Sequence, residues 1–383
     1  MPDTQKIALL IETSKAYGRG LLRSISHYAH LHDHWSVYVE ERGLDDPIPD
    51  WLEPAEFDGV ILRARERTMM EEVLDLGITT ICLGEDNPPN THTVTSDDAL
   101  SAVMAADHLL ERNFRHFAYI GIEGYVWSDI RRENFSSRIH EAGYDLRILE
   151  PCKKTLHVPR WDQVSHILAD WIIQLPKPIG IMCCYDVMAR LVIDVCRDIQ
   201  VPVPEEVAVI GVDNDQVLCE VSQPRLSSVA LDTWGIGFEA ATMLDQLMNG
   251  ENVTRHVKVP PRSIITRGST DTLAIEDRHV ASALAFIRRN ACKGVEASDV
   301  VHQVPLSRRT LERRFREQVG QSLLGAIHQV RLDRVKQFLK ETELKLDAIA
   351  HRCGFSHTPY MAAQFKKHFG VTPGTYRNKS RSG

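Results

Sequence analysis

Residues 180–215 read GIMCCYDVMARLVIDVCRDIQVPVPEEVAVIGVDND. Two short apolar runs, Gly180–Cys183 and Val207–Val212, flank a helix-length stretch, Asp186–Ile199, whose apolar residues recur with the period of a helix. Apolar strands separated by an amphipathic helix are typical of a β-α-β unit, in which the strands are parallel and covered on both faces. This part of the sequence therefore predicts an α/β fold.

The same alternation extends over the first 270 residues or so. Further strands are expected at Lys6–Ile11, Trp35–Glu40, Gly59–Leu62, Thr79–Leu83, Phe117–Ile120 and Asp145–Leu149. Further helices are expected at Gly20–His30, Ala99–Arg112, Trp161–Gln174 and Gly235–Asn249. This length is large for one sheet and suits two lobes, each built around its own parallel sheet.

The pattern changes after a short polar stretch, RGSTDT at 267–272, which has no periodicity. We expect an α/β domain over residues 1–267, a linker over 268–275, and an all-helical domain over 276–383. The helical segment has a formal charge of +10 and the rest of the chain −17. This asymmetry favours a nucleic-acid partner for the C-terminal segment, although a solvated basic surface would give the same count.

Residues 297–320 read ASDVVHQVPLSRRTLERRFREQVG. Ser298 is expected to cap one helix and Ser307 the next. In the second of these helices, Leu311 and Phe315 form an apolar stripe, with arginines on the opposite face. A helix, a tight turn and a basic helix are typical of proteins that read the major groove of double-stranded DNA, while a solvated surface helix would look similar.

The pattern repeats at 346–369, LDAIAHRCGFSHTPYMAAQFKKHF, with a turn at Gly354 and a helix cap expected at Ser356. Between the two units, Leu323–Lys340 predicts one continuous helix of about 27 Å. Such a helix can hold two recognition helices about 34 Å apart, one turn of the duplex. The repeat at this spacing makes DNA binding the favoured interpretation.

The stretch GFSHTPYMAAQFKKHFGVTPGTYR (354–377) resembles the signature of the AraC family of transcription regulators, with Met361 in place of the usual Phe. The resemblance implies two helix-turn-helix units that bind operator DNA. It places DNA-contacting residues in the first unit at Arg308, Arg309, Glu312, Arg313 and Arg316. In the second unit it places them at Ser356, His357, Thr358, Pro359 and Lys366, where phosphate contacts are expected to outweigh base contacts.

Three stretches of the α/β segment, at 108–121, 167–215 and 226–250, resemble LacI-type effector domains, which share the fold of periplasmic sugar receptors. The resemblance implies a two-lobed, periplasmic-binding-protein-like sensor of type I with a ligand cleft between its lobes. The lobes are expected at 4–113 plus 232–253, and at 114–231 plus a last strand around 256–266.

The same resemblance implies residues that would hold a sugar. Asp186 and Asp213 follow strands and would accept hydrogen bonds from hydroxyl groups, because open α/β sheets bind ligands at the carboxyl ends of their strands. Other expected contacts are Asn214, Arg131, Trp127, Tyr17 and Ser14. Each has an alternative explanation: an Asp after a strand often caps a helix, and Trp127 could belong to the core.

The fusion of these two halves is similar to the xylose operon regulators. That resemblance implies an activator of pentose catabolism genes, with D-xylose as effector, operator DNA and RNA polymerase as partners, and a homodimer as the active form. Ser14 stands where an Asn is expected, which leaves a different sugar open, and a repressor is a further alternative. An α/β enzyme is a remote alternative, since no complete catalytic or nucleotide-binding motif occurs. A transport receptor is another, since it would need export and would not carry a basic helical tail.

Composition narrows the remaining classes. The chain has 383 residues, a formal net charge of −7 and no apolar run long enough to span a bilayer. Its eight cysteines show no CxxC spacing, so we expect reduced thiols in a cytoplasmic protein rather than a disulfide scaffold or a zinc site. We expect no cofactor, no bound metal and no membrane partner.

Overall fold

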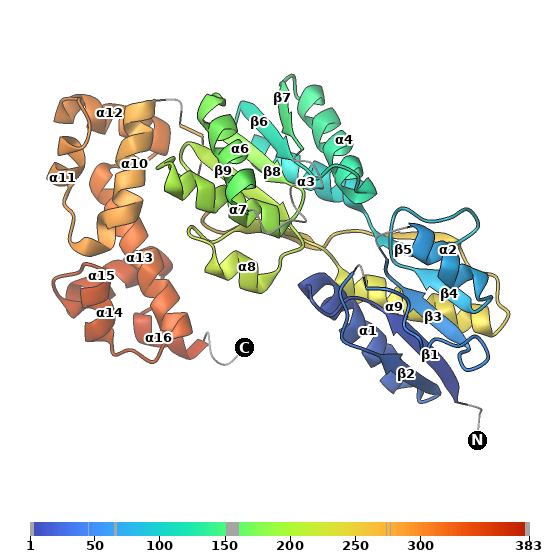
Figure 1. Ribbon diagram of the computed structural model, residues 1–383. Coiled ribbons are helices and arrows are strands. Elements are labelled where there is room, and N and C mark those ends of the chain that lie inside the picture. The colour runs from blue at the N-terminus through green and yellow to red at the C-terminus, as the bar shows by residue number, and fades with distance from the viewer. Residues whose placement is uncertain are drawn as a thin grey trace. The chain divides into compact units, whose positions relative to one another are not determined.

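A computed structural model describes residues 4–44, 46–64, 67–150, 161–272, 274–275 and 277–379. The chain divides into two compact units, Met1–Asp271 and Thr272–Gly383. The first unit is α/β and the second is helical, as Figure 1 shows, which confirms the predicted fold class. Among the described residues, no helix combines the length and the apolar character needed to cross a membrane.

The first sheet of the α/β unit has the strand order β11-β5-β4-β3-β1-β2, and all its pairs are parallel. Its strands β1 and β3 are apolar and largely buried, as expected for a sheet covered on both faces. The strands are β1 (Gln5–Leu10), β2 (Trp35–Val39), β3 (Gly59–Leu62), β4 (Thr79–Cys82), β5 (His92–Ser96) and β11 (His256–Val259).

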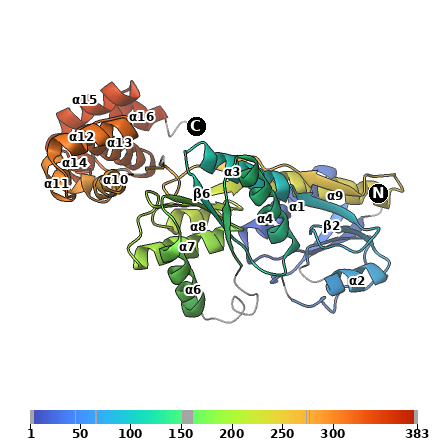
Figure 2. The same cartoon turned by 90° about the horizontal axis from the view of Figure 1, so that it is seen from above.

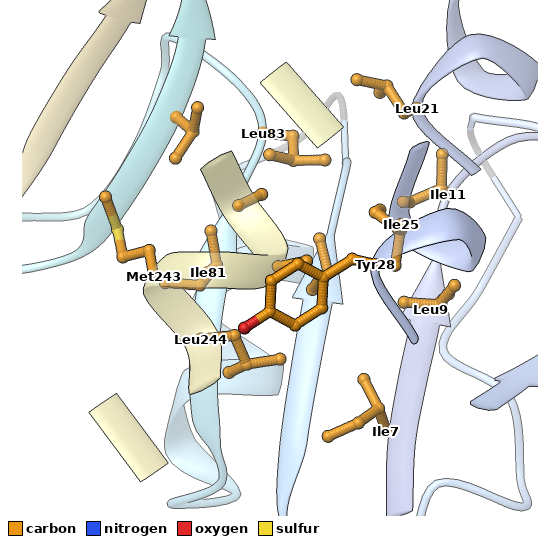
Figure 3. Packing of buried hydrophobic residues seen from close by; sticks show 14 of the residues in the cluster. Ile7, Leu9, Ile11, Leu21, Ile25, Tyr28, Ile81, Leu83, Met243 and Leu244 are labelled. Carbon is orange, nitrogen blue, oxygen red and sulfur yellow. The ribbon is translucent and has the colours of Figure 1, made fainter. Parts of the chain in front are cut away.

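Helices α1 (Ala16–His32) and α9 (Thr233–Met248) lie side by side on one face of this sheet (Figure 2). Their apolar side chains meet those of β1 in one buried cluster, shown in Figure 3, which includes Ile7, Leu9, Leu21, Ile25, Tyr28, Met243 and Leu244. Helix α2 (Arg67–Asp75) contributes Met70 and Val73 to a second cluster.

The second sheet has the order β12-β10-β9-β8-β6-β7, parallel except for β12, which runs antiparallel to β10. The strands are β6 (His116–Ile120), β7 (Leu146–Leu149), β8 (Ile179–Cys183), β9 (Val207–Val212), β10 (Ser227–Ala230) and β12 (Ser263–Ile265). Its helices are α3 (Asp98–Leu110), α4 (Val126–Glu141), α6 (Trp161–Gln174), α7 (Asp186–Asp198) and α8 (Gln216–Val221).

The last strands differ from the prediction. The segment around 256–266 was expected to belong to the second lobe as one strand, but the structure divides it. His256–Val259 pairs with β5 in the first sheet, and Ser263–Ile265 pairs with β10 in the second. Proline at 260 and 261 explains the break, because proline lacks the N–H that a continuous ladder needs.

The linker predicted for 268–275 is wrong in its first half. Ser269 and Thr270 are fully buried within the first unit. The Ser269 hydroxyl donates to the carbonyl of Val209 at 2.6 Å and accepts from the amide of Ser227 at 2.8 Å. Polar residues without periodicity therefore signal a hydrogen-bonded end of the fold here, and not an exposed connection.

The second unit consists of helices around two apolar clusters. Helices α10 (Arg278–Asn290), α11 (Ala297–His302) and α12 (Arg308–Val319) surround the first cluster with the short 3₁₀ turn η1 (Ala291–Lys293). Helices α14 (Leu346–Arg352), α15 (Thr358–Phe369) and α16 (Pro373–Lys379) surround the second. Helix α13 (Leu323–Glu341) contributes Ile327 to the first cluster and Val335 to the second, and so joins the two helical halves of the second unit.

Helix caps in this unit agree with the sequence in one case of three. Ser307 caps α12 by accepting from the amide of Thr310. Ser298 is not a cap, because α11 begins earlier and Glu296 occupies its N-cap, where Asp299 completes a capping box. Ser356 is not a cap either: α15 begins at Thr358 after His357, with Pro359 in its first turn.

Candidate ligand pocket and DNA interface

The α/β unit contains a cavity of about 590 Å³, including the part open to solvent, at the carboxyl ends of strands from both sheets. The lining residues follow β1, β3, β4, β5, β6, β8 and β9: Lys15, Tyr17, Arg63, Leu83, Gly84, Glu85, Thr95, Ser96, Asp98, Trp127, Arg131, Tyr185 and Asp213.

Arg131 of α4 is held by buried partners. Its Nε and Nη2 donate to Oδ1 of Asp98 at 2.8 and 2.6 Å, and its Nη1 donates to the carbonyl of Cys184. Both side chains of the Arg131–Asp98 pair are at most 5% exposed. The guanidinium also lies 4.9 Å from the ring centroid of Trp127. Arg131 therefore fixes the aromatic wall of the pocket, because a cation over a ring face is attracted to it.

A second arginine is anchored in the same way from the first sheet. Arg63 forms an ion pair with Glu12, whose side chain is fully buried. Its guanidinium lies 4.6 Å from the ring centroid of Tyr17, which lines the pocket. Both arginines of the pocket are thus neutralised by protein carboxylates.

Asp213 is a pocket acid whose carboxylate has no hydrogen-bond donor among the described residues. It adopts φ 108°, a conformation that Asp and Asn tolerate better than most residues. Among the described residues its carboxylate accepts no hydrogen bond, although its amide donates to Val229. Burial raises the pKa of Asp213 to about 6, against the opposing effect of nearby Arg131, Arg63 and Lys15. This carboxylate can therefore accept hydrogen bonds from a ligand.

Glu85 follows β4 and is also incompletely paired. Its Oε1 is buried, and the described part of the chain offers it no hydrogen-bond partner. Burial, reinforced by the charge of Asp98, raises the pKa of Glu85 above its ordinary value. A buried carboxylate oxygen without a partner is costly, so its position facing a pocket points to a ligand donor.

Asp186 and Asn214, both predicted contacts, are bonded within the protein and are not part of the lining. Asp186 is 1% exposed, and its carboxylate accepts from the hydroxyl of Ser228 at 2.6 Å and from the amide of Asp215 at 2.8 Å. Asn214 accepts from Arg267 at 2.8 Å. Both residues hold the turn that presents Asp213, and their oxygens are used within the protein.

The structure brings the predicted residues Asp213, Arg131, Trp127 and Tyr17 together, while Ser14 is exposed and outside the lining. Its neighbour Lys15 lines the pocket instead. Polar lining residues that the sequence did not predict are Lys15, Arg63, Glu85, Thr95, Ser96, Asp98 and Tyr185. All of them end or follow a strand, which is the signal that could have identified them.

The DNA interface predicted on α12 is an exposed row of arginines. Leu311 and Phe315 are fully buried, so the opposite face of the helix is exposed to solvent. It carries Arg308, Arg309, Arg313 and Arg316, with Glu312 beside them. Arg308 pairs with Glu312, and Arg313 with Glu317, each at 2.9 Å. These exposed pairs are weak and can be exchanged for contacts to DNA.

The corresponding face of α15 is less polar. Met361 and Phe365 are buried, and Pro359, Ala363 and Lys366 are exposed. Ser356 and His357 are exposed before the helix, whereas the hydroxyl of Thr358 donates to Asp347. A lysine beside small apolar residues suits a phosphate contact better than base recognition.

Comparison with known proteins matches both units. Residues 106–270 match the model for a periplasmic binding protein-like domain, and residues 300–379 match that for a helix-turn-helix domain. The xylose operon regulatory protein of Escherichia coli is 31% identical over 97% of each chain, and that of Haemophilus influenzae is 29% identical over 97% of this chain and 98% of its own. The solved structure of the xylose-binding transcription activator xylR covers 98% of both chains at 30% identity, with a TM-score of 0.84.

A two-lobed α/β unit with a pocket, followed by paired helix-turn-helix units of the AraC type, defines a ligand-responsive transcription regulator and not an enzyme. The similarity to the Escherichia coli protein extends over nearly the whole chain and includes both units. The chain belongs to the family of xylose operon regulatory proteins.

Proposed function

We propose that the pocket binds a neutral monosaccharide, with D-xylose as the effector, and that binding raises the affinity of the second unit for operator DNA. The observation that carries this proposal is the pairing pattern of the pocket. Its arginines are neutralised by carboxylates, while Asp213 and one oxygen of Glu85 remain available. Acceptors without partners are the groups that sugar hydroxyls require.

Charge balance favours a neutral sugar over a phosphorylated or acidic one. The lining contains three cationic groups, Lys15, Arg63 and Arg131, and three carboxylates, Glu85, Asp98 and Asp213. A negatively charged sugar would lie close to these carboxylates. Arg63 and Arg131 are already paired with carboxylates, so among the lining residues Lys15 is the cation left to neutralise it. Bringing like charges together in a partly buried site is unfavourable.

The aromatic residues provide the other half of sugar recognition. Trp127 and Tyr185 line the pocket with ring centroids 5.9 Å apart and nearly perpendicular planes, at 64°. The C–H groups of a pyranose are apolar and pack on aromatic rings, while its hydroxyls bond to polar groups around them. Trp127, held by Arg131, would therefore bind the apolar face of the sugar.

Calorimetric titration of the full chain tests the sugar. We expect heat of binding with D-xylose and weaker or no binding with D-glucose, L-arabinose and D-xylulose 5-phosphate. Binding of the phosphate ester in preference to D-xylose would contradict the charge argument. Binding of another neutral pentose in preference would retain the pocket and change the effector.

The affinity for D-xylose should fall in acid. Hydroxyl donors require the Asp213 carboxylate, and its pKa near 6 means that a proton competes with the sugar below that pH. Between pH 7.5 and pH 5 we expect a loss of about tenfold, since one proton must be displaced. Calorimetry at both pH values measures this loss. The Asp213→Asn variant should lose most of the dependence, and an unchanged pH profile in that variant would assign it to another group.

Base recognition is proposed for α12. Replacing Arg313 by Ala should cost about 1–3 kcal/mol of operator affinity and relax the preference at one base, because arginine can donate to guanine O6 and N7 together. Arg309→Ala should act in the same way. Binding to randomised sites at several salt concentrations measures both effects.

Lys366→Ala on α15 is the matched control. A phosphate contact predicts uniformly weaker binding to all sequences and a salt slope lower by about one unit. If Arg313→Ala also weakens all sequences alike, without any change in the preferred site, α12 is not the reader.

The proposal includes a cytoplasmic homodimer that binds paired half-sites and recruits RNA polymerase as an activator. Its support is the similarity to the activator structure and the two helix-turn-helix units of each chain. Light scattering with and without D-xylose tests the dimer, and transcription from an operator-bearing template tests the sign of regulation.

A further inference from the structure

The first unit ends in a rigid anchor at Thr270, one residue before its boundary at Asp271. Thr270 is fully buried. Its hydroxyl bonds to Nε2 of His108 and to the hydroxyl of Ser227, both at 2.7 Å, and its carbonyl accepts from Nε of Arg112 at 2.8 Å. Three residues, from α3, the turn that follows it and β10, thus fix the point at which the chain leaves the first unit.

Helix α3 connects this anchor with the pocket. Asp98, at its first position, lines the pocket and pairs with Arg131. His108, in its last turn, and Arg112, just after its end, bond to Thr270. The ten residues from Asp98 to His108 span about 15 Å of helix. Helix α3 packs along α4, which carries Arg131 and Trp127 (Figure 2), so the pocket wall and the anchor are joined by one packed pair of helices.

A second chain of hydrogen bonds leads from Asp213 to the same anchor. The next residue, Asn214, accepts from Nη2 of Arg267 at 2.8 Å. The amide of Arg267 donates to the hydroxyl of Ser227 at 2.8 Å, and Ser227 bonds to Thr270. One route from the pocket runs through α3 and the other through Arg267 and Ser227 of β10. Both routes therefore meet at Thr270.

The anchor keeps its charge state throughout the physiological pH range. Burial, with a further contribution from Arg112, lowers the pKa of His108 to about 3. The imidazole is therefore neutral, and its bond to Thr270 does not depend on pH near neutrality. The hydrogen bonds of the anchor are therefore unaffected by the pH change that protonates Asp213 in the pocket, whose pKa is about 6.

We propose that Thr270, positioned by His108 and Arg112, is the residue through which the state of the sugar pocket is transmitted to the DNA-binding unit. The inference rests on the proposed function, since it assigns the route of that regulation. A ligand changes a distant equilibrium only through an element whose position differs between the two states. A fixed exit point converts a movement of α3 and β10 into a movement of the following chain, whereas a loose one would absorb it.

The test compares sugar affinity with coupling in the full chain. Thr270→Val keeps the shape of the side chain and removes its hydroxyl. Arg112→Lys is a milder variant, which removes the guanidinium that donates to the Thr270 carbonyl but keeps the positive charge. We expect D-xylose affinity within about threefold of wild type in both, since neither residue lines the pocket. We expect the ratio of operator affinities with and without D-xylose to fall by about 2- to 30-fold.

Arg138→Ala is the matched control, because it removes a 2.7 Å contact of Arg138 with Asp107 of α3 and leaves the anchor intact. It should retain the wild-type ratio. A wild-type ratio in Thr270→Val and Arg112→Lys would overturn the assignment of Thr270. If the operator affinity of the wild-type chain is the same with and without D-xylose, the proposed function is refuted, and this inference with it.

Discussion

Replacing Asp213 by Asn should weaken the binding of D-xylose by about 2–4 kcal/mol, or roughly 30- to 1,000-fold. The variant keeps the size of the side chain and tolerates the φ of 108°, so the turn should survive. It replaces a carboxylate that can accept from two hydroxyls by an amide with one acceptor oxygen and an N–H donor that would lack an acceptor. Calorimetric titration of the full chain at pH 7.5 measures the loss.

Asp215→Asn is the matched control for this prediction. Asp215 lies two residues away in the same turn, caps α8 by accepting from the amides of Val217 and Leu218, and does not line the pocket. Asn caps helices about as well as Asp, so the fold should be unaffected. Equal losses in the two variants would mean that the turn matters and the Asp213 carboxylate does not.

Replacing Arg131 by Ala should destabilise the first unit by about 3–5 kcal/mol and abolish sugar binding. The substitution leaves the Asp98 carboxylate buried beside Ser96 without its countercharge, and an uncompensated buried charge is costly. It also removes the cation that lies over Trp127. All six tryptophans lie in residues 1–271, so urea unfolding followed by tryptophan fluorescence reports on this unit alone.

Arg132→Ala, one residue further along α4, provides the comparison. Its ion pair with Glu150 is 27% and 22% exposed, so its loss should cost about 1 kcal/mol or less. The double variant Arg131→Ala/Asp98→Ala should recover part of the stability, because it removes the stranded charge as well. If the single variants at 131 and 132 unfold at the same urea concentration, Arg131 is not the buried anchor described here.

Much of the fold could be predicted because it follows from apolar periodicity. The runs 59–62 and 207–212 coincide with β3 and β9. The strands that the sequence did not reveal, β5 (HTVTS) and β10 (SSVA), are rich in Ser and Thr. These residues resemble loop residues in sequence, yet they are buried here by pairing within the sheets. Composition alone cannot distinguish the two situations.

The pocket was predictable to the extent that polar residues after strands face it. Position after a strand does not say in which direction a side chain points: Asp186 turns into the protein and Asp213 into the pocket. The missed residues Arg63 and Asp98 depend on the partners Glu12 and Arg131, which are 51 and 33 positions away in the chain. Contacts of this range are set by tertiary packing, which no local pattern encodes.

Under the proposed function, sugar in the pocket controls binding of DNA by the same chain. The direct measurement is a titration of the full chain against a DNA duplex selected from a random library in the presence of D-xylose. We expect an affinity at least about fivefold higher with saturating D-xylose than without it, as for coupled sites, and no such difference in Asp213→Asn. Equal operator affinity of the wild-type chain with and without D-xylose would contradict it.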